Sequence, residues 1–460
     1  MTQSGETPNL ALTASDRTIV RILILGVILP LLDTTLINIS LHGIGQQLGA
    51  PLSMMQWVVT AYTLAAASAV PLCTWLVQRI GAGRLWILCL WLFLAGTCLS
   101  ALAQNVEFLI FSRVLQGIAT GLLLPTMQTI VVTSVGQDKA RSALSAMSVP
   151  SVLAPILGPL IGGVTLQFFD WRLLFWAHAP ICILAIVLAA RGLPGGSAKT
   201  SSGFDSTGFL LLCPGLVTVF YGLSTLGHDD AREWVTPTLT GVALMMIFTW
   251  HAYCKKGNAI VDISLFKVSN LRASCALLFF SSVAYYGGIL LFPLYLIQIG
   301  GYEPNLAGLL VALHGVGILI ARHKLPHASR RWGDRPIAQA AGFLALVGST
   351  ILLVPQFVES PYLMALGMLL RGAGIGVLTI LSMAGAYQGL GSTQVAHASS
   401  LTRIITHLGA TIGASAVAGL IAAGDLNADT GSNYAHGHLA LMAAVILCGL
   451  ACRRLSKSVA

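Results

Sequence analysis

The chain has 460 residues, of which 56% are hydrophobic and only 9% are charged, and its mean hydropathy is +0.82. Soluble domains carry about 25% charged residues, so this composition excludes an ordinary soluble protein and predicts an integral membrane protein. The nine cysteines lie mostly inside apolar runs without paired spacing. We therefore expect no disulfide framework, no metal site and no bound cofactor.

Apolar runs follow one another along almost the whole chain, and a helix needs about 20 such residues to cross a bilayer. The polar leader, residues 1–18, lacks a small-residue cleavage site, so we expect it to be retained. The pattern predicts an all-α membrane protein with about fourteen spans, at 19–41, 53–78, 84–104, 107–134, 141–168, 172–192, 206–226, 235–255, 272–299, 305–325, 336–357, 361–388, 394–424 and 436–454.

With fourteen spans, the Lys and Arg residues are distributed unevenly between the two sides of the membrane. Twenty of the 25 Lys and Arg residues fall in loops on the side of the N-terminus, and only Arg172 and Arg232 fall on the other side. Positive residues concentrate on the cytoplasmic side of membrane proteins, so both termini are predicted to be cytoplasmic. The net charge of +9 is thus a signal of topology and does not indicate a nucleic-acid partner.

One acidic residue lies deep in a span. Asp33 sits within "GVILPLLDTTLINISL", residues 26–41 of the first span. A carboxylate at the centre of a membrane helix costs about 2.5–3.5 kcal/mol, and such residues mark functional sites by default. A carboxyl group that gains and loses a proton can couple transport to proton flow. The alternative is that Asp33 only ties helices together through a buried ion pair.

Arg113 is the expected partner of Asp33. It stands at four-residue spacing with Gly117 and Gly121, so the three share one face of the fourth span. The glycines let a neighbouring backbone come close, where the arginine can meet a carboxylate. A purely structural role for the arginine stays open.

A weak internal repeat relates the fourth span to the twelfth. "RVLQGIATGLLLPTM" (113–127) resembles "MLLRGAGIGVLTILSM" (368–383), so that Gly117 and Gly121 match Gly372 and Gly376. Internal repeats are typical of secondary transporters, which bind substrate between their halves. The predicted organisation is a leader at 1–18, a first six-helix bundle at 19–192, a linker with two inserted helices at 193–271, a second six-helix bundle at 272–454 and a tail at 455–460.

Several motifs together resemble one family. "LLDTTLINISL", "QWVVTAYTL", "RVLQGIATG", "LGPLIGG" and "DWRLLFWAHAP" stand in the order and spacing of the fourteen-helix drug:proton antiporters, family 2 of the major facilitator superfamily. The resemblance implies two six-helix bundles around a central cavity, and export driven by proton entry. It also implies that Asp33 is the protonation site with Arg113 beside it, and that the antiporter motif of the fifth helix comprises Gly158, Pro159, Gly162 and Gly163.

The chain departs from the family pattern in the loop after the second span. There "TWLVQRIGAGR" has Thr74 in place of a glycine and Gln78 in place of the acid that helps to latch the two halves. We expect Gln78, Arg79 and Gly81 to form an altered gating motif. Residues expected to face the substrate cavity are Asn38, Trp57, Tyr62, Gln116, His178, His314, Arg371, Arg403 and His407, although lone histidines are often packing residues and aromatic residues at span ends are often interfacial anchors.

The predicted function is proton-coupled efflux of small amphipathic compounds, by alternating access, in a bacterial inner membrane. Neither an ATP-binding motif nor an enzyme-like pairing of nucleophile and base is present in the sequence. One intramembrane acid against Arg113, Arg371 and Arg403 favours neutral, weakly cationic or anionic substrates over dications. Two alternatives stay open: a dedicated exporter of an endogenous metabolite, and a non-transporting membrane sensor or scaffold. The need for a periplasmic adaptor is not decided by the sequence.

Overall fold

The computed structural model describes residues 12–147, 165, 168–194, 203–225, 231–255, 259–391, 394–422 and 430–452. Within these ranges the chain is helical and contains no strand. The first group of helices is α1 (Ala14–Leu48), α2 (Leu52–Ala69), α3 (Leu72–Ile80), α4 (Ala82–Ala101), α5 (Val106–Val135), α6 (Gln137–Met147) and α8 (Arg172–Gly192). They are followed by α9 (Ser206–Ser224), α10 (Ala231–Lys255), α11 (Ser269–Gln298), α12 (Pro304–Trp332), α13 (Asp334–Leu353), α14 (Pro361–Gly385), α15 (Gln394–Ala422) and α16 (Thr430–Cys452).

The helices match the expected spans closely. Twelve described helices are long and apolar enough to cross a membrane, and the bent pair formed by α2 and α3 gives a thirteenth span. The fifth expected span, 141–168, begins in α6, but 148–164 lie outside the described residues. The four residues of the predicted antiporter motif, Gly158, Pro159, Gly162 and Gly163, lie there too. This is a multi-pass membrane protein.

Two spans differ in shape from the expectation. The first helix is longer than 19–41, because Thr13 caps its start by a reciprocal pair of hydrogen bonds with Asp16, and it continues to Leu48. The second span is broken: α2 and α3 meet at an angle of 56°. Pro71, which has no backbone N–H to donate to the preceding turn, stands at the break.

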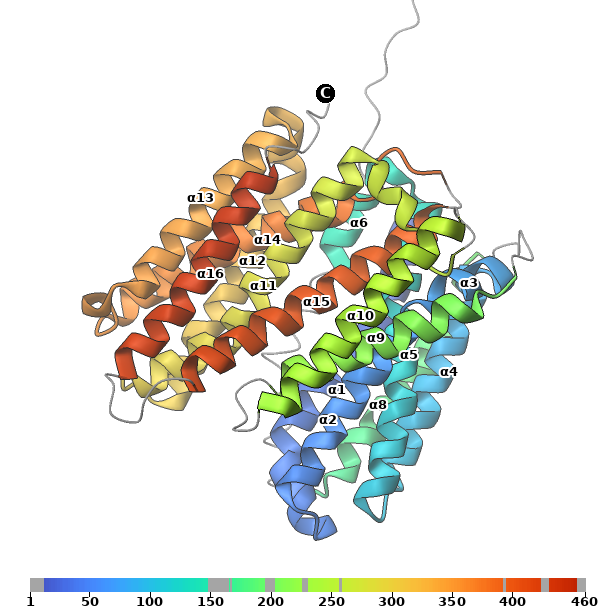
Figure 1. Ribbon diagram of the computed structural model, residues 1–460, viewed down its shortest axis with the longest axis horizontal. Helices are drawn as coiled ribbons and strands as arrows, with labels where there is room; N and C mark the ends of the chain where they lie inside the picture. The colour runs from blue at the N-terminus through green and yellow to red at the C-terminus, as the bar shows by residue number, and fades with distance from the viewer. Residues whose placement is uncertain are drawn as a thin grey trace, which may run out of the picture.

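The helices form two groups with a hairpin across them. In Figure 1 α1, α2, α4, α5 and α8 of the first group lie at the lower right with α6 above them, and the second group, α11 to α16, extends from the left to the centre. Helix α5 packs on α2 and α4, and in the second group α14 packs on α12 and α13. The hairpin of α9 and α10 packs on α2 from the first group and on α15 from the second. Within the hairpin it is α9 that packs on both groups, while α10 packs on α9.

The two groups are joined by hydrogen bonds at one end of the molecule, which we call the closed end. It holds α3, α6 and the start of α15, in the upper part of Figure 1. The described hydrogen bonds between the groups lie there: Thr74 to Ser400 (2.9 Å), Thr129 to Ser399 (3.0 Å), Tyr387 to Gln128 (3.0 Å), Gln78 to His397 (3.2 Å), Ser145 to the Arg322 carbonyl (3.2 Å), Thr74 to the Ala396 carbonyl (3.2 Å) and Ser400 to the Val70 carbonyl (3.4 Å).

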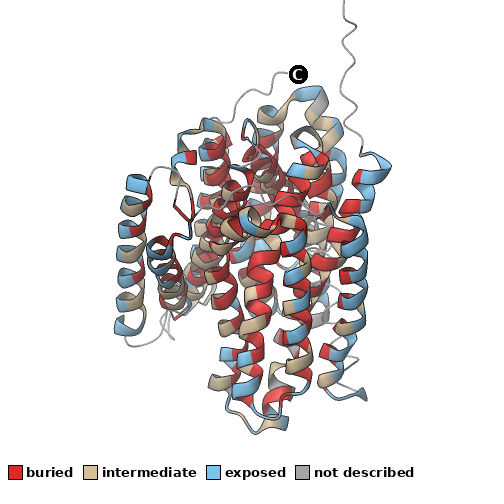
Figure 2. Cartoon of the chain, turned by 90° about the vertical axis from the view of Figure 1, so that its right-hand side faces the viewer, coloured by how far each residue is buried: buried red, intermediate tan, exposed pale blue. Residues whose placement is uncertain are grey.

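The outer faces of the helices are apolar. Large hydrophobic side chains such as Trp250, Phe343 and Tyr362 are exposed, and pale exposed positions follow the outward faces in Figure 2 while buried positions line the inside. A soluble protein rarely exposes so much contiguous apolar surface, whereas a bilayer would cover it. The apolar residues thus serve both the core and the lipid-facing surface.

Candidate functional site

Asp33 lies inside the first group of helices. It sits on α1, and only 2% of its side chain is exposed. Pro30, one turn earlier, has no backbone N–H to donate to the preceding turn of α1. The Pro30 carbonyl accepts a hydrogen bond from the Thr34 hydroxyl at 2.8 Å. A buried carboxylate needs a partner of opposite charge, and the neighbouring helix α5 provides it.

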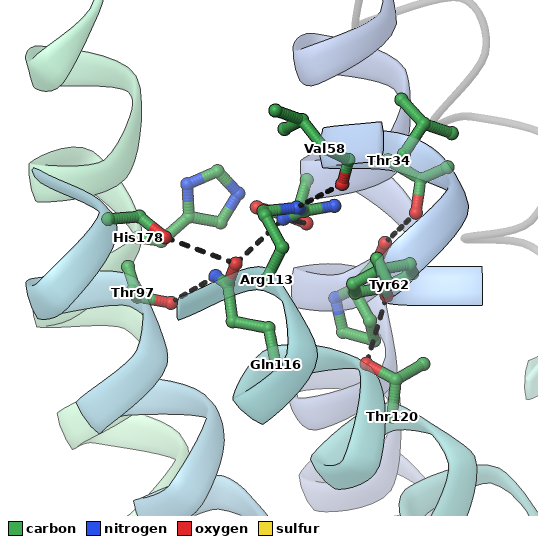
Figure 3. Close-up of polar contacts among 12 residues, drawn as sticks. Thr34, Val58, Tyr62, Thr97, Arg113, Gln116, Thr120 and His178 are labelled. Carbon is green, nitrogen blue, oxygen red and sulfur yellow. Dashed lines mark hydrogen bonds and ion pairs between the residues drawn. The ribbon is translucent and has the colours of Figure 1, made fainter. Parts of the chain in front are cut away.

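The Arg113 guanidinium donates to the Asp33 carboxylate over 2.5 Å. The pairing that the sequence predicts is therefore present, across a separation of 80 residues. The same Nη1 atom donates to the Gln116 amide oxygen at 2.7 Å, and Nε approaches the Val58 carbonyl at 3.4 Å. Because Nη1 carries two protons, it can serve Asp33 and Gln116 together. The guanidinium consequently keeps anchors that do not depend on the Asp33 charge (Figure 3).

A chain of hydrogen bonds fixes Gln116 in turn. Its amide nitrogen donates to the Thr97 hydroxyl of α4 at 2.8 Å, so its oxygen is left facing Arg113. The Ser100 hydroxyl lies 3.4 Å from that oxygen and 2.7 Å from Ser112. Sequence reasoning missed Thr97, Ser100 and Ser112. Single small hydroxyl residues in a membrane helix usually bond to their own backbone, so their spacing carries no clear signal.

Tyr62 closes the site from α2. Its ring lies under the Arg113 guanidinium, with 4.2 Å from the guanidinium carbon to the ring centre, a cation–π contact. The Tyr62 hydroxyl donates to Thr120 at 2.9 Å and also lies against the Thr34 hydroxyl, which stands beside Asp33 (Figure 3). The aromatic ring thus covers the arginine while its hydroxyl joins α2 to α1 and α5.

The glycines of α5 allow α2 to come this close. A side chain at Gly117 would collide with the Tyr62 carbonyl, and one at Gly121 would collide with the Ala66 carbonyl. The corresponding Gly372 of α14 meets the His314 carbonyl of α12 in the same way. Small residues at four-residue spacing therefore set the distance between helices in both groups.

The other residues expected at the site are dispersed. Trp57 is 44% exposed and stacks on Tyr221 of α9, with ring centres 6.1 Å apart. His178 is buried and contacts the Leu174 carbonyl at 2.6 Å through Nδ1. The side chain of Asn38 lies outside the described part of the structure, although its backbone belongs to α1.

The expected residues of the second group fall in two places. Arg371 and His314 are buried among α11, α12 and α14. Arg403 and His407 lie on α15; Arg403 is within electrostatic range of Tyr62, and His407 faces Phe220 of α9 at 6.5 Å. None of these four forms an ion pair with a carboxylate among the described residues.

The expected gating residues lie at the closed end. Gln78 contacts His397 of α15, Arg79 lies over the Trp75 ring at 5.2 Å, and Gly81 joins α3 to α4. Gly81 has φ of +86°, which a residue with a side chain rarely adopts. No group of three metal-binding side chains occurs among the described residues.

The sequence pattern that describes the Major Facilitator Superfamily matches residues 23–414. The chain belongs to this superfamily. The resemblance predicted from the sequence motifs is confirmed, because the relatives include multidrug export and multidrug resistance proteins. Members of the superfamily are transporters of small molecules and not enzymes.

Two curated relatives and one solved structure show the extent of the similarity. The chain is 28% identical over 395 residues to the multidrug resistance protein B homolog of Mycobacterium tuberculosis, covering 85% of this chain and 73% of that one. It is 30% identical over 297 residues to the multidrug export protein EmrB of Escherichia coli, covering 64% and 58%. The structure of the proton:xylose symporter XylE has the same fold, with a TM-score of 0.67 at 14% identity, over 97% of both chains.

Proposed function

We propose that this superfamily member is a proton-coupled exporter of small amphipathic compounds in a bacterial inner membrane, with both termini cytoplasmic. The single observation that carries the coupling is the buried ion pair between Asp33 and Arg113. The similarity to a multidrug export protein and to a multidrug resistance protein supports the substrate class.

The geometry supports a simple exchange. When Asp33 takes a proton, its bond to Arg113 loses the charge that holds it, whereas Gln116 and the Val58 carbonyl still anchor the guanidinium. Tyr62 contacts Arg113, donates to Thr120 and lies against Thr34 beside Asp33, so a change in the ion pair reaches α1, α2 and α5 together. Protonation would therefore alter the packing of three helices, as alternating access requires.

The closed end would be the cytoplasmic end in this proposal, since the positive loops of the chain belong to that side. The structure then represents a state with its cytoplasmic side shut. A proton that enters down a potential of 100 mV contributes about 2.3 kcal/mol, enough for roughly fifty-fold accumulation of an exported neutral solute.

The test is substrate-induced proton release from detergent-purified protein, screened across a mixed panel of amphiphiles. We expect at least one compound to release protons from the wild type, and Asp33→Asn to abolish the release while the compound still binds. Asp170→Asn makes the same change at a half-exposed acid that pairs with Arg172, so it is the matched control and should keep the release. Equal release from wild type and Asp33→Asn would refute the role of Asp33.

A further inference from the structure

Arg371 is a buried charge without a carboxylate. It lies on α14, and only 1% of it is exposed. One of its Nη2 protons is donated to the Ala284 carbonyl of α11 over 2.6 Å. Among the described residues, neither Nε nor Nη1 has a hydrogen-bond partner, and no acidic side chain pairs with the guanidinium.

The first half of the chain shows what this position normally holds. Gln116 stands directly before Gly117, and Arg371 stands directly before the matching Gly372. Both pack against a glycine of the preceding long helix: Gln116 on Gly96, and Arg371 on Gly348. The neutral amide of Gln116 finds partners for both its nitrogen and its oxygen, whereas Arg371 brings a full charge that uses few of its donors.

The surroundings of Arg371 are aromatic and rich in further donors. Its guanidinium lies over the Phe292 ring at 4.5 Å. His438 of α16 contacts the same ring at 5.6 Å, is 2% exposed, and has an Nε2 atom without a partner among the described residues. His314 of α12 also lies within electrostatic range of Arg371; its ring approaches the Met368 backbone, but neither ring nitrogen makes a hydrogen bond of normal geometry.

A charge that is removed from water and left unpaired is strongly unfavourable, and so are buried donors without acceptors. A single negative group would correct both at once, because it supplies the opposite charge and several acceptor positions. One guanidinium balances one negative charge. The aromatic rings beside it suit the apolar body that such a group would carry.

We propose that Arg371, with His314 and His438, forms an anion-binding site in the second half of the transporter. The site takes one monovalent anionic group, either the carboxylate of an aromatic amphipathic substrate or a free halide ion. It is closed to solvent in this structure, so the anion enters in another state of the transport cycle. In this respect the inference rests on the proposed function. It adds a positively charged site in the second group of helices to the negatively charged Asp33 of the first.

The experiment compares an acid with its uncharged analogue. Tritiated 1-naphthoate and 1-naphthamide are measured by equilibrium dialysis against full-length protein in detergent, in chloride and in gluconate buffer. We expect Arg371→Gln, which installs the residue of the equivalent first-half position, to weaken 1-naphthoate binding about tenfold or more and to leave 1-naphthamide binding unchanged. Arg371→Lys keeps the charge and should retain part of the affinity for the acid.

The buffers separate the two sources of the anion. If the site holds a halide, chloride rather than gluconate raises the melting temperature of the wild type but not of Arg371→Gln. If the site holds the substrate carboxylate, 1-naphthoate raises the melting temperature of the wild type, but not of Arg371→Gln, in both buffers. The proposal is wrong if Arg371→Gln both binds the acid and responds to chloride as the wild type does, if it loses both naphthalene compounds equally, or if neither anion binds to or stabilises the wild type.

Asp33→Asn distinguishes this proposal from the one on which it rests. That variant should bind 1-naphthoate like the wild type, because Asp33 lies in the other half of the molecule. Proton release that survives in Asp33→Asn would overturn proton coupling at Asp33 and leave the anion site standing. Anion binding that is indifferent to Arg371 would overturn the anion site alone.

Discussion

Asp33 and Arg113 carry opposite charges at positions where no more than 2% of either side chain is exposed. Each charge depends on the other, because a buried ion without its partner destabilises the folded protein by several kcal/mol. Gln116 and Tyr62 hold the guanidinium from two further sides. At the scale of single residues, protonation of the acid and the position of the arginine are therefore linked.

This linkage gives a prediction for stability. We expect Arg113→Gln to lower the free energy of unfolding by about 3–5 kcal/mol, since it leaves the Asp33 carboxylate buried and unpaired. Unfolding in mixed micelles with a rising fraction of denaturing detergent measures the change. The double variant Asp33→Asn with Arg113→Gln should recover most of the loss, because both charges are gone. A double variant as unstable as Arg113→Gln would contradict the prediction.

At the scale of elements, the carboxylate of Asp205 connects the start of α9 to the end of α10 by hydrogen bonds. Asp205 caps the start of α9 through the Gly208 backbone N–H at 3.1 Å, and it accepts hydrogen bonds from Lys255 at 2.7 Å and His251 at 3.0 Å, both near the end of α10. Burial by itself would raise the pKa of Asp205. The bonds from Lys255, His251 and the backbone N–H groups of Gly208 and Ile260 outweigh it and lower the pKa from 3.8 to about 2.

The sign of this shift predicts how stability depends on pH. A lowered pKa in the folded state stabilises the protein above the unfolded value of 3.8, and the contribution is lost as the pH falls towards about 2. We expect Asp205→Asn to melt at a lower temperature than the wild type at pH 5, and the difference to shrink as the pH approaches 2. Asp170→Asn, at a half-exposed acid, is the control. A difference that does not depend on pH would refute the assignment.

At the scale of the whole molecule, the two groups of helices meet through polar contacts at the closed end. Gln78 stands where the family resemblance predicts an acid, and it reaches the second group through His397. The Asp262 backbone N–H donates to Nδ1 of His397 at 3.3 Å, so the ring proton lies on Nε2. Nε2 of His397 then donates to the side-chain amide of Gln78. This bond requires the amide oxygen of Gln78, not its nitrogen, to face the ring, so the amide is flipped.

We predict that His397→Ala loosens the closed end. A hydrogen bond contributes about 0.5–1.5 kcal/mol, and the bond from His397 to Gln78 joins the two groups, so its loss should shift the balance between the closed and open states by roughly twofold to tenfold. Hydrogen exchange read by mass spectrometry should then be faster in α3 and at the start of α15. His323→Ala, at an exposed histidine of α12, serves as the control. Exchange as slow as in the control would show that His397 is no part of the latch.

Local chemistry explains what could be predicted without the structure. The spans follow from runs of apolar residues, and Asp33 and Arg113 stand out because charge is costly in a membrane. The division of the chain into halves stays a prediction, as do the roles of the residues at the site. The division rests on the repeat between the fourth and twelfth spans, and the roles rest on the buried charges and on the family resemblance.

The membrane class and the order of the helices follow from residues close together in the chain, and Asp33 and Arg113 stand out because each is a single charge within an apolar span. The fold was needed to reveal the break between α2 and α3, the partners of Gln116, the contact of Trp57 with α9 and the isolation of Arg371. These features depend on which faces of distant helices meet and at what register. A helix that faces lipid on one side and protein on the other is apolar on both sides. Its pattern of apolar residues therefore does not specify which face packs on a neighbour or at what register.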